Sequence, residues 1–392
     1  MIKINSKNKR FTRIEINLTN LSNNIRVLKS WLNTPETRIM AVVKSNAYGH
    51  GMVEISKQAV KSGVNALGVV LAEDGIRLRK AGIKIPVYLL GEPPMEIVRD
   101  AIKYDFVLGL NSFEKAELIS QRCEKFGKKI TVHIKVDTGM NRIGINFREA
   151  VDEIERIVGL KGLKVEGIFT HFSCAGEKDE SYTKMQWQRF QDVLGQLEAR
   201  KINFQVVHCA NSAAFLRYRD FHLDMVRLGI SIYGLSPFGI DSGSWLDSKI
   251  SELLVGLKPV LCLKSKVSFV KAVTEGESIS YGATFRTARP SIIATIPIGY
   301  ADGYSRLFSN KASVLINGGL APVIGNVTMD QIMVDITDIK GNRQIKEGTE
   351  VTLIGNSTSR KMTADYLADI MGTINYEVLC MLKDRIPRIY IY

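Results

Sequence analysis

The sequence predicts an α/β protein that consists of a (β/α)8 TIM barrel followed by a mainly β domain. A chain of 392 residues is longer than one hydrophobic core usually serves. From about Met40 to Gly229, short apolar runs alternate with amphipathic stretches. After about Leu254, strands follow one another with turn signals and little helix between them. We therefore expect two domains, residues 1–255 and residues 256–392.

The predicted barrel rests on eight apolar runs of strand length. Most are rich in β-branched residues and bounded by Gly, Asp, Asn or His, as buried parallel strands are. Amphipathic segments such as 54–62 and 181–200 separate them and predict helices. Eight strands close a barrel, which favours it over an open doubly wound sheet, the structural alternative. The runs are RIMAVV, VNALGVVLA, IPVYLLG, DFVLGL, ITVHIKVD, LKVEGIFTH, FQVVHC and LDMVRLGI.

The second domain is predicted from strands that come in close succession. The segment TEGE marks a turn between the first two of them. The helical pattern TADYLADIMG precedes a final basic strand, RIPRIYIY. The other strand-like runs are VLCLKSKVSFV, SISYGATF, SIIATIPIGY, KASVLINGG, APVIGNVTMDQIMVDI and EVTLIG.

The formal net charge of +13 favours acidic small molecules, anionic surfaces or nucleic acid as partners. No module of basic and aromatic residues for nucleic-acid binding is visible, so we expect no nucleic-acid partner. Basic residues crowd the first segment at Lys3, Lys7, Lys9, Arg10 and Arg13, and predict a loose, solvated tail.

The five cysteines are odd in number, widely spaced and without a Cys-x-x-Cys pair. This pattern predicts free thiols in a reducing compartment and neither a disulfide framework nor a metal site. The first residues contain no apolar core of signal-peptide length, and no run is long enough to cross a bilayer. We therefore expect a cytoplasmic protein with no membrane partner.

The first candidate for chemistry is Lys44, which directly follows the predicted strand in AVVKSNAYGHG. A lysine at the carboxyl end of a barrel strand points into the mouth, where barrel enzymes keep their active sites. Partial desolvation lowers its pKa and makes a neutral amine available for Schiff-base chemistry. Taken alone, such a lysine is more often a strand-end residue that extends its charge to solvent.

A predicted phosphate site changes this balance. In such barrels the loops after strands seven and eight frequently bind phosphate. Asn211 and Ser212 stand where a helix begins, with its unpaired amides and positive dipole end. Gly229 allows close approach of the backbone, so the amides of Gly229 and Ile230 can bind phosphate oxygens. Each feature alone could be a helix cap or a turn glycine, but together with Lys44 they predict a phosphorylated aldehyde cofactor.

Over nearly its whole length the chain resembles bacterial alanine racemases, which are pyridoxal-phosphate enzymes of fold type III. The first matching stretch is close to the attachment motif for that cofactor. The resemblance implies a barrel plus β domain, a homodimer with shared active sites, and interconversion of L- and D-alanine for peptidoglycan. It is carried by AVVKSNAYGHG, HIKVDTGMNRIG, GIFTHFS, HCANSAA, MVRLGISIYG, SYGATF, IPIGYADGY, MDQ, NYEV and RIPRIY.

The resemblance also assigns the catalytic residues. Lys44 resembles the lysine that binds the cofactor and serves as one of two bases, and Tyr281 resembles the second base, supplied by the partner subunit. Arg227 resembles the arginine that donates to the pyridine nitrogen, and His171 resembles the histidine that links it to the catalytic tyrosine. Because tyrosine has a pKa near ~10, cationic neighbours must stabilise its phenolate.

The remaining site residues follow from the same resemblance. The residues that resemble the phosphate ligands of the family are Tyr48, Ser212, Gly229, Ile230 and Tyr376. Asn211, at the predicted helix start, is also expected to bind the cofactor. The groups expected around the substrate carboxylate and the cofactor phenolate are Arg142, Tyr300, Met329 and Asp330. Lys135 resembles a lysine that is often carbamylated in this family, where the modified side chain positions Arg142.

Two departures from the family pattern concern the entrance to the site. Many members have an aspartate where this chain has Gly176, and an arginine where it has Asn326. These two residues can pair at the entrance in the family, so the substrate range is open. His133 alternates with apolar residues in a strand, which favours an ordinary hydrogen-bonded core histidine.

Three alternatives remain. A serine or broad-specificity racemase of the same fold is the nearest. Fold-related decarboxylases typically place a carboxylate at the pyridine nitrogen, where this chain has Arg227. A pyridoxal-phosphate carrier without turnover would need neither Tyr281 nor the β domain.

Overall fold

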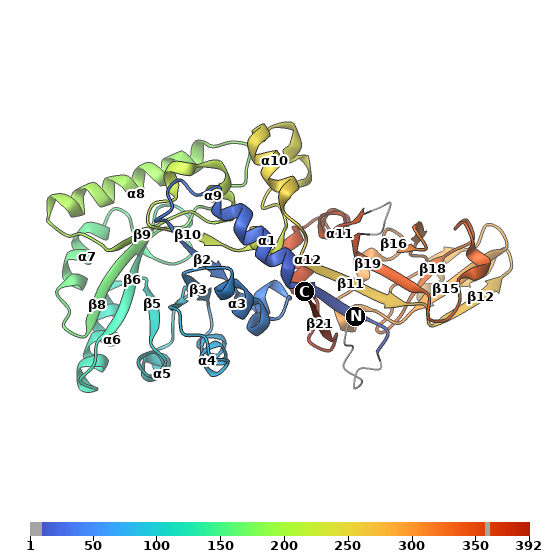
Figure 1. Ribbon diagram of the computed structural model, residues 1–392, viewed down its shortest axis with the longest axis horizontal. Helices are drawn as coiled ribbons and strands as arrows, with labels where there is room; N and C mark the ends of the chain where they lie inside the picture. The colour runs from blue at the N-terminus through green and yellow to red at the C-terminus, as the bar shows by residue number, and fades with distance from the viewer. Residues whose placement is uncertain (1–9, 357–360) are drawn as a thin grey trace. The chain divides into compact units, whose positions relative to one another are not determined.

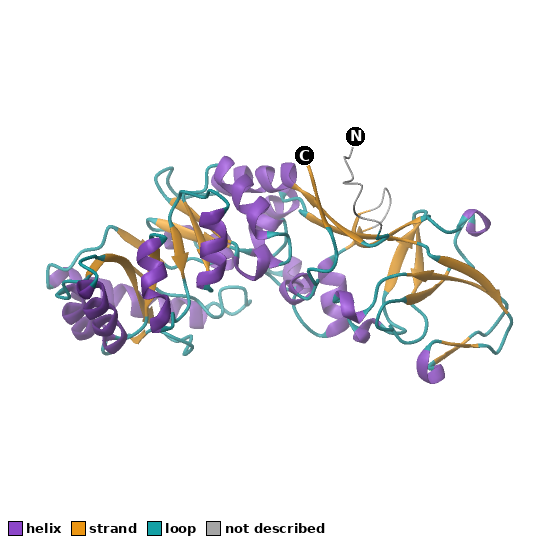
Figure 2. Cartoon of the chain, turned by 90° about the horizontal axis from the view of Figure 1, so that it is seen from below, coloured by secondary structure: helices purple, strands orange, loops and turns teal. Residues whose placement is uncertain are grey.

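The computed structural model describes residues 10–356 and 361–392, so Lys3, Lys7 and Lys9 of the predicted tail lie outside the described residues. The chain forms two compact units. The barrel unit comprises Leu21–Ala47 and Met52–Lys258. The β unit comprises the described residues up to Asn20, together with Tyr48–Gly51 and Pro259–Tyr392. Figure 2 shows helices and strands mixed in the first and mostly strands in the second.

Eight parallel strands form the barrel, in the spatial order β10-β2-β3-β4-β5-β6-β8-β9. The ends of this order meet through two backbone hydrogen bonds, from Asp224 N to Val207 O (3.2 Å) and from Arg227 N to Ala210 O (2.9 Å). The predicted (β/α)8 barrel is therefore confirmed. The strands are β2 (Arg38–Val42), β3 (Ala66–Val69), β4 (Val87–Leu89), β5 (Phe106–Leu110), β6 (Ile130–Asp137), β8 (Leu163–Phe169), β9 (Val206–His208) and β10 (Met225–Leu228); the short β7 (Ile145–Asn146) pairs with β6.

Helices surround these strands (Figure 1), because each has one apolar face to bury. In α7, for example, Val151, Ile154 and Ile157 are buried at helical spacing. The α-helices are α1 (Leu18–Lys29), α3 (Met52–Lys61), α4 (Ala72–Lys80), α5 (Val98–Lys103), α6 (Phe113–Lys125), α7 (Ala150–Val158), α8 (Ser181–Ala199), α9 (Ser212–Arg217) and α10 (Ser248–Gly256). Short 3-10 helices are η1 (Met95–Ile97), η2 (Arg219–Phe221), η3 (Ile230–Tyr233) and η4 (Ile240–Ser244).

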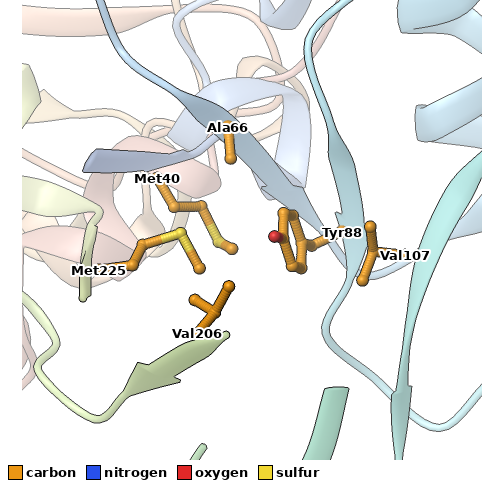
Figure 3. Close-up of a cluster of buried hydrophobic side chains, with 6 residues drawn as sticks. All are labelled: Met40, Ala66, Tyr88, Val107, Val206 and Met225. Atoms are coloured by element: carbon orange, nitrogen blue, oxygen red, sulfur yellow. The ribbon is translucent and has the colours of Figure 1, made fainter. Parts of the chain in front are cut away.

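The interior of the barrel is filled by side chains and is not a pore. Figure 3 shows one buried cluster in which residues from β2, β3, β4, β5, β9 and β10 face one another. Its members are Met40, Ala66, Tyr88, Val107, Val206 and Met225, with Leu90 packed against them. Packing of this kind supplies the hydrophobic stabilisation and leaves the strand ends to carry the chemistry.

The β unit contains a larger sheet of order β17-β16-β19-β11-β1-β21 with β20 beside β19, a sheet β12-β15-β18, and a pair β13-β14. Its strands are β1 (Arg13–Asn17), β11 (Leu261–Lys266), β12 (Phe269–Val273), β13 (Ser278–Ile279), β14 (Phe285–Arg286), β15 (Ser291–Ile296), β16 (Ser313–Ile316), β17 (Gly319–Pro322), β18 (Ile332–Asp335), β19 (Glu350–Asn356), β20 (Lys361–Met362) and β21 (Arg388–Ile391). Its helices are α11 (Ala364–Met371), α12 (Asn375–Cys380), η5 (Tyr281–Ala283), η6 (Tyr300–Asp302), η7 (Arg306–Phe308) and η8 (Asn342–Gln344). The mainly β second part is thus confirmed.

The strand β1 was placed with the barrel by the predicted boundary, but it pairs with the second sheet. It runs antiparallel to β11 and parallel to β21. Ile14 and Ile16 become fully buried there, which supplies the physical reason. Arg13 pairs with Glu15 and Glu350. The prediction of a solvated tail is therefore wrong for this part of the chain.

Candidate active site

Lys44 lies two residues beyond the end of β2, half-buried, at the start of an unusual turn. The next four residues, Ser45–Tyr48, all have φ values of 52° to 54°. This left-handed helical conformation costs about 1–2 kcal/mol for each L-residue. Asn46 stabilises the turn because its Oδ1 accepts the amide of Met52 (2.8 Å). Such strain persists only where the surrounding structure imposes it, and it is typical of ligand sites.

The register of the barrel brings this turn to the end that carries the predicted phosphate segment. In the pairing of β10 with β2, Leu228 lies opposite Ala41. Beyond β10, the hydroxyl of Tyr233 donates to the carbonyl of Val42 (2.9 Å). Lys44 and η3 (Ile230–Tyr233) therefore follow neighbouring strands at the same end of the barrel.

The residues of the predicted phosphate segment lie together, but not all in the expected roles. Ser212 Oγ accepts the amide of Gly229 (3.0 Å) and lies 3.1 Å from Ser231 Oγ. Asn211 caps α9: its Oδ1 accepts the amide of Ala214 (3.0 Å), and its Nδ2 donates to a backbone carbonyl. Both polar groups of Asn211 are therefore engaged in holding the helix start. The amides of Ser212 and Ile230 open a helix each and have no acceptor within it.

Arg227 is the centre of a buried polar network behind this segment. Its Nη2 donates to the carbonyls of Thr170 (2.7 Å) and Cys209 (2.9 Å), and also contacts His171 Nδ1 (3.1 Å). Its Nη1 contacts His208 Nδ1 (2.8 Å). Among the described residues no carboxylate forms an ion pair with it. Burial lowers the pKa of Arg227 to about 10, so the guanidinium is still cationic at neutral pH.

His171 is placed beside Arg227, as the sequence predicts. Because Arg227 can only donate, His171 Nδ1 accepts, and the ring proton is on Nε2. Burial first, and then the positive charge of Arg227, lower the pKa of His171 well below its usual value. His171 is therefore a neutral imidazole whose N–H is directed away from the arginine.

Lys135 and Arg142 form a second cationic group near the end of β6. Lys135 is only 3% exposed, and its Nζ makes no hydrogen bond or ion pair with any described residue. Burial, followed by repulsion from Arg142, lowers the pKa of Lys135 to about 8. Arg142 is exposed on the turn after the strand. A substantial fraction of Lys135 is thus a neutral amine in mildly alkaline solution.

In the β unit, the two tyrosines expected near the phosphate lie together. The ring centroids of Tyr48 and Tyr376 are 5.9 Å apart. Burial raises the pKa of both, so both are hydroxyl donors at neutral pH. Gly49 has a φ of 80°, and a Cβ there would overlap the carbonyl oxygen of Leu379. Only glycine fits this close approach.

Tyr281 is presented very differently, with 75% of its surface exposed. It starts the short η5 turn between β13 and β14, where Ser280, Gly282 and Ala283 all have positive φ. Asn326 holds this turn from the side. Its Nδ2 donates to the carbonyl of Tyr281 (2.7 Å), and its own carbonyl accepts from Ser280 Oγ (2.6 Å). The residue that departs from the family pattern therefore fixes the backbone of the predicted base.

The predicted substrate residues Tyr300, Met329 and Asp330 also gather in the β unit. The amide of Tyr300 donates to the carbonyl of Thr328 (3.1 Å), which joins the two loops. Tyr300 is 43% and Met329 54% exposed, so both are available to a ligand. Asp330 instead pairs with Arg385 (2.9 Å), which gives it a structural partner.

Within each of the two units, the structure thus gathers several of the predicted site residues. Lys44, the phosphate segment, Arg227 with His171, and Lys135 belong to the barrel unit, while the tyrosines, Met329 and Asp330 belong to the β unit. Sequence reasoning missed His208, which contacts Arg227 directly. Its position in FQVVHC, immediately before the phosphate segment, was the available signal.

Comparison with known proteins identifies the family. Residues 16–237 match the family described as "Alanine racemase, N-terminal domain", and residues 260–390 match "Alanine racemase, C-terminal domain". The chain belongs to the alanine racemase family. Its similarity to that family covers the barrel strands, the phosphate segment and the turn of Tyr281.

Individual members of the alanine racemase family agree with this over almost the full length. The alanine racemase of Clostridium novyi (strain NT) is 42% identical over 96% of this chain and 94% of its own. The solved alanine racemase of Clostridium difficile 630 has a TM-score of 0.89 at 39% identity, covering 98% and 97% of the two chains. That of Bartonella henselae, solved with covalently bound pyridoxal phosphate, has a TM-score of 0.85 at 29% identity, covering 97% and 99%.

Three further expectations concern what the chain does not carry. None of the five cysteines forms a disulfide. Across residues 10–356 and 361–392, no three His, Cys, Asp or Glu side chains are grouped so that they could hold a metal ion. Within the same residues, none of the helices combines the length and the apolar character that a membrane span requires.

Proposed function

We propose that the protein interconverts L- and D-alanine with pyridoxal 5′-phosphate, using Lys44 and Tyr281 of the partner subunit as the two bases. The product D-alanine would serve peptidoglycan. The observation that carries the proposal is Arg227, a buried arginine that forms no ion pair with a carboxylate of the described residues. Its strand, β10, pairs with β2, the strand that leads to Lys44. The names of the relatives support alanine as the substrate.

The residues present fit this cofactor. Ser212, Gly229 and Ile230 offer a hydroxyl and helix-start amides, which suit a phosphate group. Arg227 offers donors that cannot lose their proton at neutral pH, which suits an unprotonated ring nitrogen. Lys44 offers an amine for the aldehyde. Tyr48 and Tyr376 each offer a hydroxyl, and the covalently bound pyridoxal phosphate of the Bartonella henselae protein supports the same assignment.

When bound, the cofactor supplies an electron-accepting ring that makes the α-proton of an amino acid acidic. The chain's own residues then move that proton. Nζ of Lys44 and the phenol oxygen of Tyr281 exchange it with opposite faces of the α-carbon, which is what inversion requires. His171, neutral and with its proton on Nε2, can donate to the tyrosine oxygen and favour its phenolate form. Arg142, Tyr300 and Met329 would surround the substrate carboxylate.

Carbamylation of Lys135 is part of the proposal. A buried amine with a pKa of about 8 can attack carbon dioxide, forming a C–N bond and releasing one proton. The resulting carboxylate would replace a buried cation by an anion beside Arg142. That ion pair would hold Arg142 toward the substrate, whereas the unmodified lysine repels it.

The proposal includes a homodimer in the cytoplasm. Tyr281 is largely exposed on the single chain, which suits a residue that completes the site of a second copy. Five cysteines without a disulfide are consistent with a reducing compartment.

The second candidate is a serine or broad-specificity amino-acid racemase. It is favoured by the two departures from the family pattern at the expected entrance to the site. Gly176 has no side chain there, and the side-chain amide of Asn326 is hydrogen-bonded to the Tyr281 turn. A carrier of the cofactor without turnover is disfavoured because the Tyr281 turn would then have no task.

Two measurements test the proposed function. Reduction with borohydride should fix the cofactor to the peptide that contains Lys44, and labelling of another lysine would refute the assignment. Chiral analysis over a panel of amino acids should give the highest kcat/KM for alanine. A higher kcat/KM for serine, lysine or arginine would favour the broad-specificity candidate instead.

A further inference from the structure

A chain of hydrogen bonds runs from Arg227 through the barrel interior to a glutamate. Arg227 Nη1 contacts His208 Nδ1 (2.8 Å), and His208 Nε2 contacts His133 Nδ1 (2.9 Å). His133 Nε2 then contacts Glu166 Oε2 (3.4 Å). His208 is fully buried and His133 is 1% exposed, whereas the Glu166 side chain keeps 20% of its surface exposed. None of these three residues has a role in the proposed reaction.

The chemistry of the end groups fixes the direction of every bond. Arg227 can only donate, so His208 accepts at Nδ1 and bears its proton on Nε2. His133 must then accept at Nδ1 and bear its proton on Nε2, which it donates to the Glu166 carboxylate. Both imidazoles are therefore neutral and hold the same tautomer. A guanidinium cation at one end is joined to a carboxylate anion at the other by donors that all point the same way.

The state of each group agrees with this pattern. Burial lowers the pKa of His208 and of His133, which keeps both rings neutral. The hydrogen bond from His133 is the main cause that lowers the pKa of Glu166 to about 2. Other charges that act on these groups are Lys164, 3.3 Å from Glu166, and Arg38, whose positive charge acts on both histidines.

The barrel backbone is locally irregular where it accommodates this series of hydrogen bonds. Pairing of β6 with β8 runs from Val132 opposite Val165 to His133 opposite Gly167, so Glu166 is the extra residue of a β-bulge. Bulges of this kind redirect a side chain and recur beside active sites. At Gly167 a Cβ would overlap the His133 ring, so only glycine leaves room for it. Tyr88 packs against this ring in a T-shaped arrangement, with 4.9 Å between the ring centroids.

Aromatic packing holds the other histidine in place. Phe169 stacks on His208 with ring centroids 4.8 Å apart and planes within 8° of each other. The same phenyl ring lies 5.5 Å below the Arg227 guanidinium. The side chain of Phe169 therefore orients both His208 and Arg227, which are neighbours in the series of hydrogen bonds.

We propose that Glu166 is the counter-charge of Arg227, relayed through His208 and His133, and that these three are positioning residues for the guanidinium. A buried cation needs compensation, and no carboxylate of the described chain forms an ion pair with Arg227. Hydrogen-bonded chains polarise one another, so a charge at the far end affects the near end. The consequence for the cofactor rests on the proposed function, whereas the relay itself does not.

The decisive variant is Glu166→Gln, which keeps an acceptor oxygen for His133 and removes only the charge. The matched control is Glu155→Gln, which makes the same charge change on α7, where Glu155 forms an exposed ion pair with Arg200. Because the chain has only five histidines, their ring ¹H–¹⁵N resonances can be followed in the purified full-length protein. Glu166→Gln should shift the resonances of both His133 and His208, and the control should shift neither. A shift confined to His133 would overturn the relay.

A second readout connects the relay to Arg227. Glu166→Gln should weaken binding of pyridoxal 5′-phosphate about tenfold and change the absorption spectrum of the bound cofactor, since partners of ligand-binding groups typically have effects of this size. The control should keep both. Unchanged affinity together with an unchanged spectrum would overturn the positioning role. If no variant, nor the wild type, binds the cofactor, the proposed function fails while the histidine resonances still test the relay.

A second variant, at an exposed position, tests the proposal even if Glu166→Gln fails to fold. Lys164→Met removes the exposed cation beside Glu166 and leaves every member of the relay in place. It should shift the His133 and His208 resonances in the direction opposite to Glu166→Gln. Absence of any shift at His208 would contradict the proposal independently of the first variant.

Discussion

The two halves of the candidate site are held by different physical means. Arg227 and the barrel residues around it are buried and fixed by hydrogen bonds that leave little freedom. Tyr281 is exposed on a turn of positive φ, fixed through its backbone by Asn326 alone among the described side chains. The barrel half is thus preorganised within one chain. The tyrosine half is displayed toward solvent, as the proposed shared site requires.

The largest effect should come from Lys44→Ala, which removes the amine proposed to bind the cofactor. Racemase activity should fall about 10³-fold or more, as expected for loss of a covalent and proton-transferring group. Covalent attachment of the cofactor should be lost as well, measured by borohydride reduction and peptide mapping. The exposed Lys161→Ala serves as the control and should keep both. Retained attachment in Lys44→Ala would show that another lysine binds the cofactor.

The next largest effect should be the loss of stability caused by a substitution of Arg227. Arg227→Met leaves His208 Nδ1 and the carbonyls of Thr170 and Cys209 without a donor in a buried site. We expect a loss of about 4 kcal/mol in the free energy of unfolding, since each buried unpaired acceptor costs about 1–3 kcal/mol. Chemical denaturation measures this. A loss below about 1 kcal/mol would mean that the network is solvated and not preorganised.

The pH dependence of the free energy of unfolding should distinguish Lys135 from other lysines. Its pKa is about 8 in the folded protein and 10.5 in the reference state, so the folded form disfavours the proton. Between pH 8 and 10.5 the unfolded chain binds more protons, and stability should rise with pH, by up to about 3 kcal/mol. Lys135→Met should remove this rise, measured by denaturation in bicarbonate-free buffer. Equal slopes for both proteins would contradict the burial of a bare amine.

The same lysine supplies a direct test of carbamylation. With ¹³C-bicarbonate, wild-type protein should show a carbamate resonance that Lys135→Met lacks. A wild-type protein without that resonance at mildly alkaline pH would refute the modification.

The smallest effect should come from the turn that presents the tyrosine. Asn326→Ala removes the hydrogen bond to the Tyr281 carbonyl, so kcat should fall about tenfold, or about 1.4 kcal/mol. Cofactor affinity should stay unchanged, because the barrel half is untouched. The exposed Gln344→Ala is the control in the same unit. If Asn326→Ala weakens cofactor binding as much as it lowers kcat, the two halves are not independent.

Features that depend only on where a single strand or helix begins or ends could be predicted from the sequence. The eight apolar runs correspond to the eight barrel strands. The positions of Lys44 just beyond a strand and of Ser212 at a helix start were predicted because strand ends and helix starts have local signals. The register of distant strands has no such signal. For this reason β1 was assigned to the wrong part of the fold, although its apolar alternation was visible.

The parts of the site that sequence reasoning missed depend on non-local pairing. The bulge that turns Glu166 toward His133 arises only once β6 and β8 are paired. His133 was expected to be a hydrogen-bonded core histidine, which it is, but its partners were not foreseeable. Asn326 was visible as a departure from the family, whereas its bond to Tyr281 requires the two loops to be folded together.

The central claim is that the displayed tyrosine completes the site of a partner chain. Lys44→Ala and Tyr281→Ala proteins should each be nearly inactive. When they are dissociated, mixed equally and reassociated, half of the dimers should be mixed, and each mixed dimer has one intact site. Activity should then recover to about a quarter of the wild-type value. If mass spectrometry shows that subunits have exchanged while activity stays at the level of the single variants, Tyr281 acts within its own chain and the account is wrong.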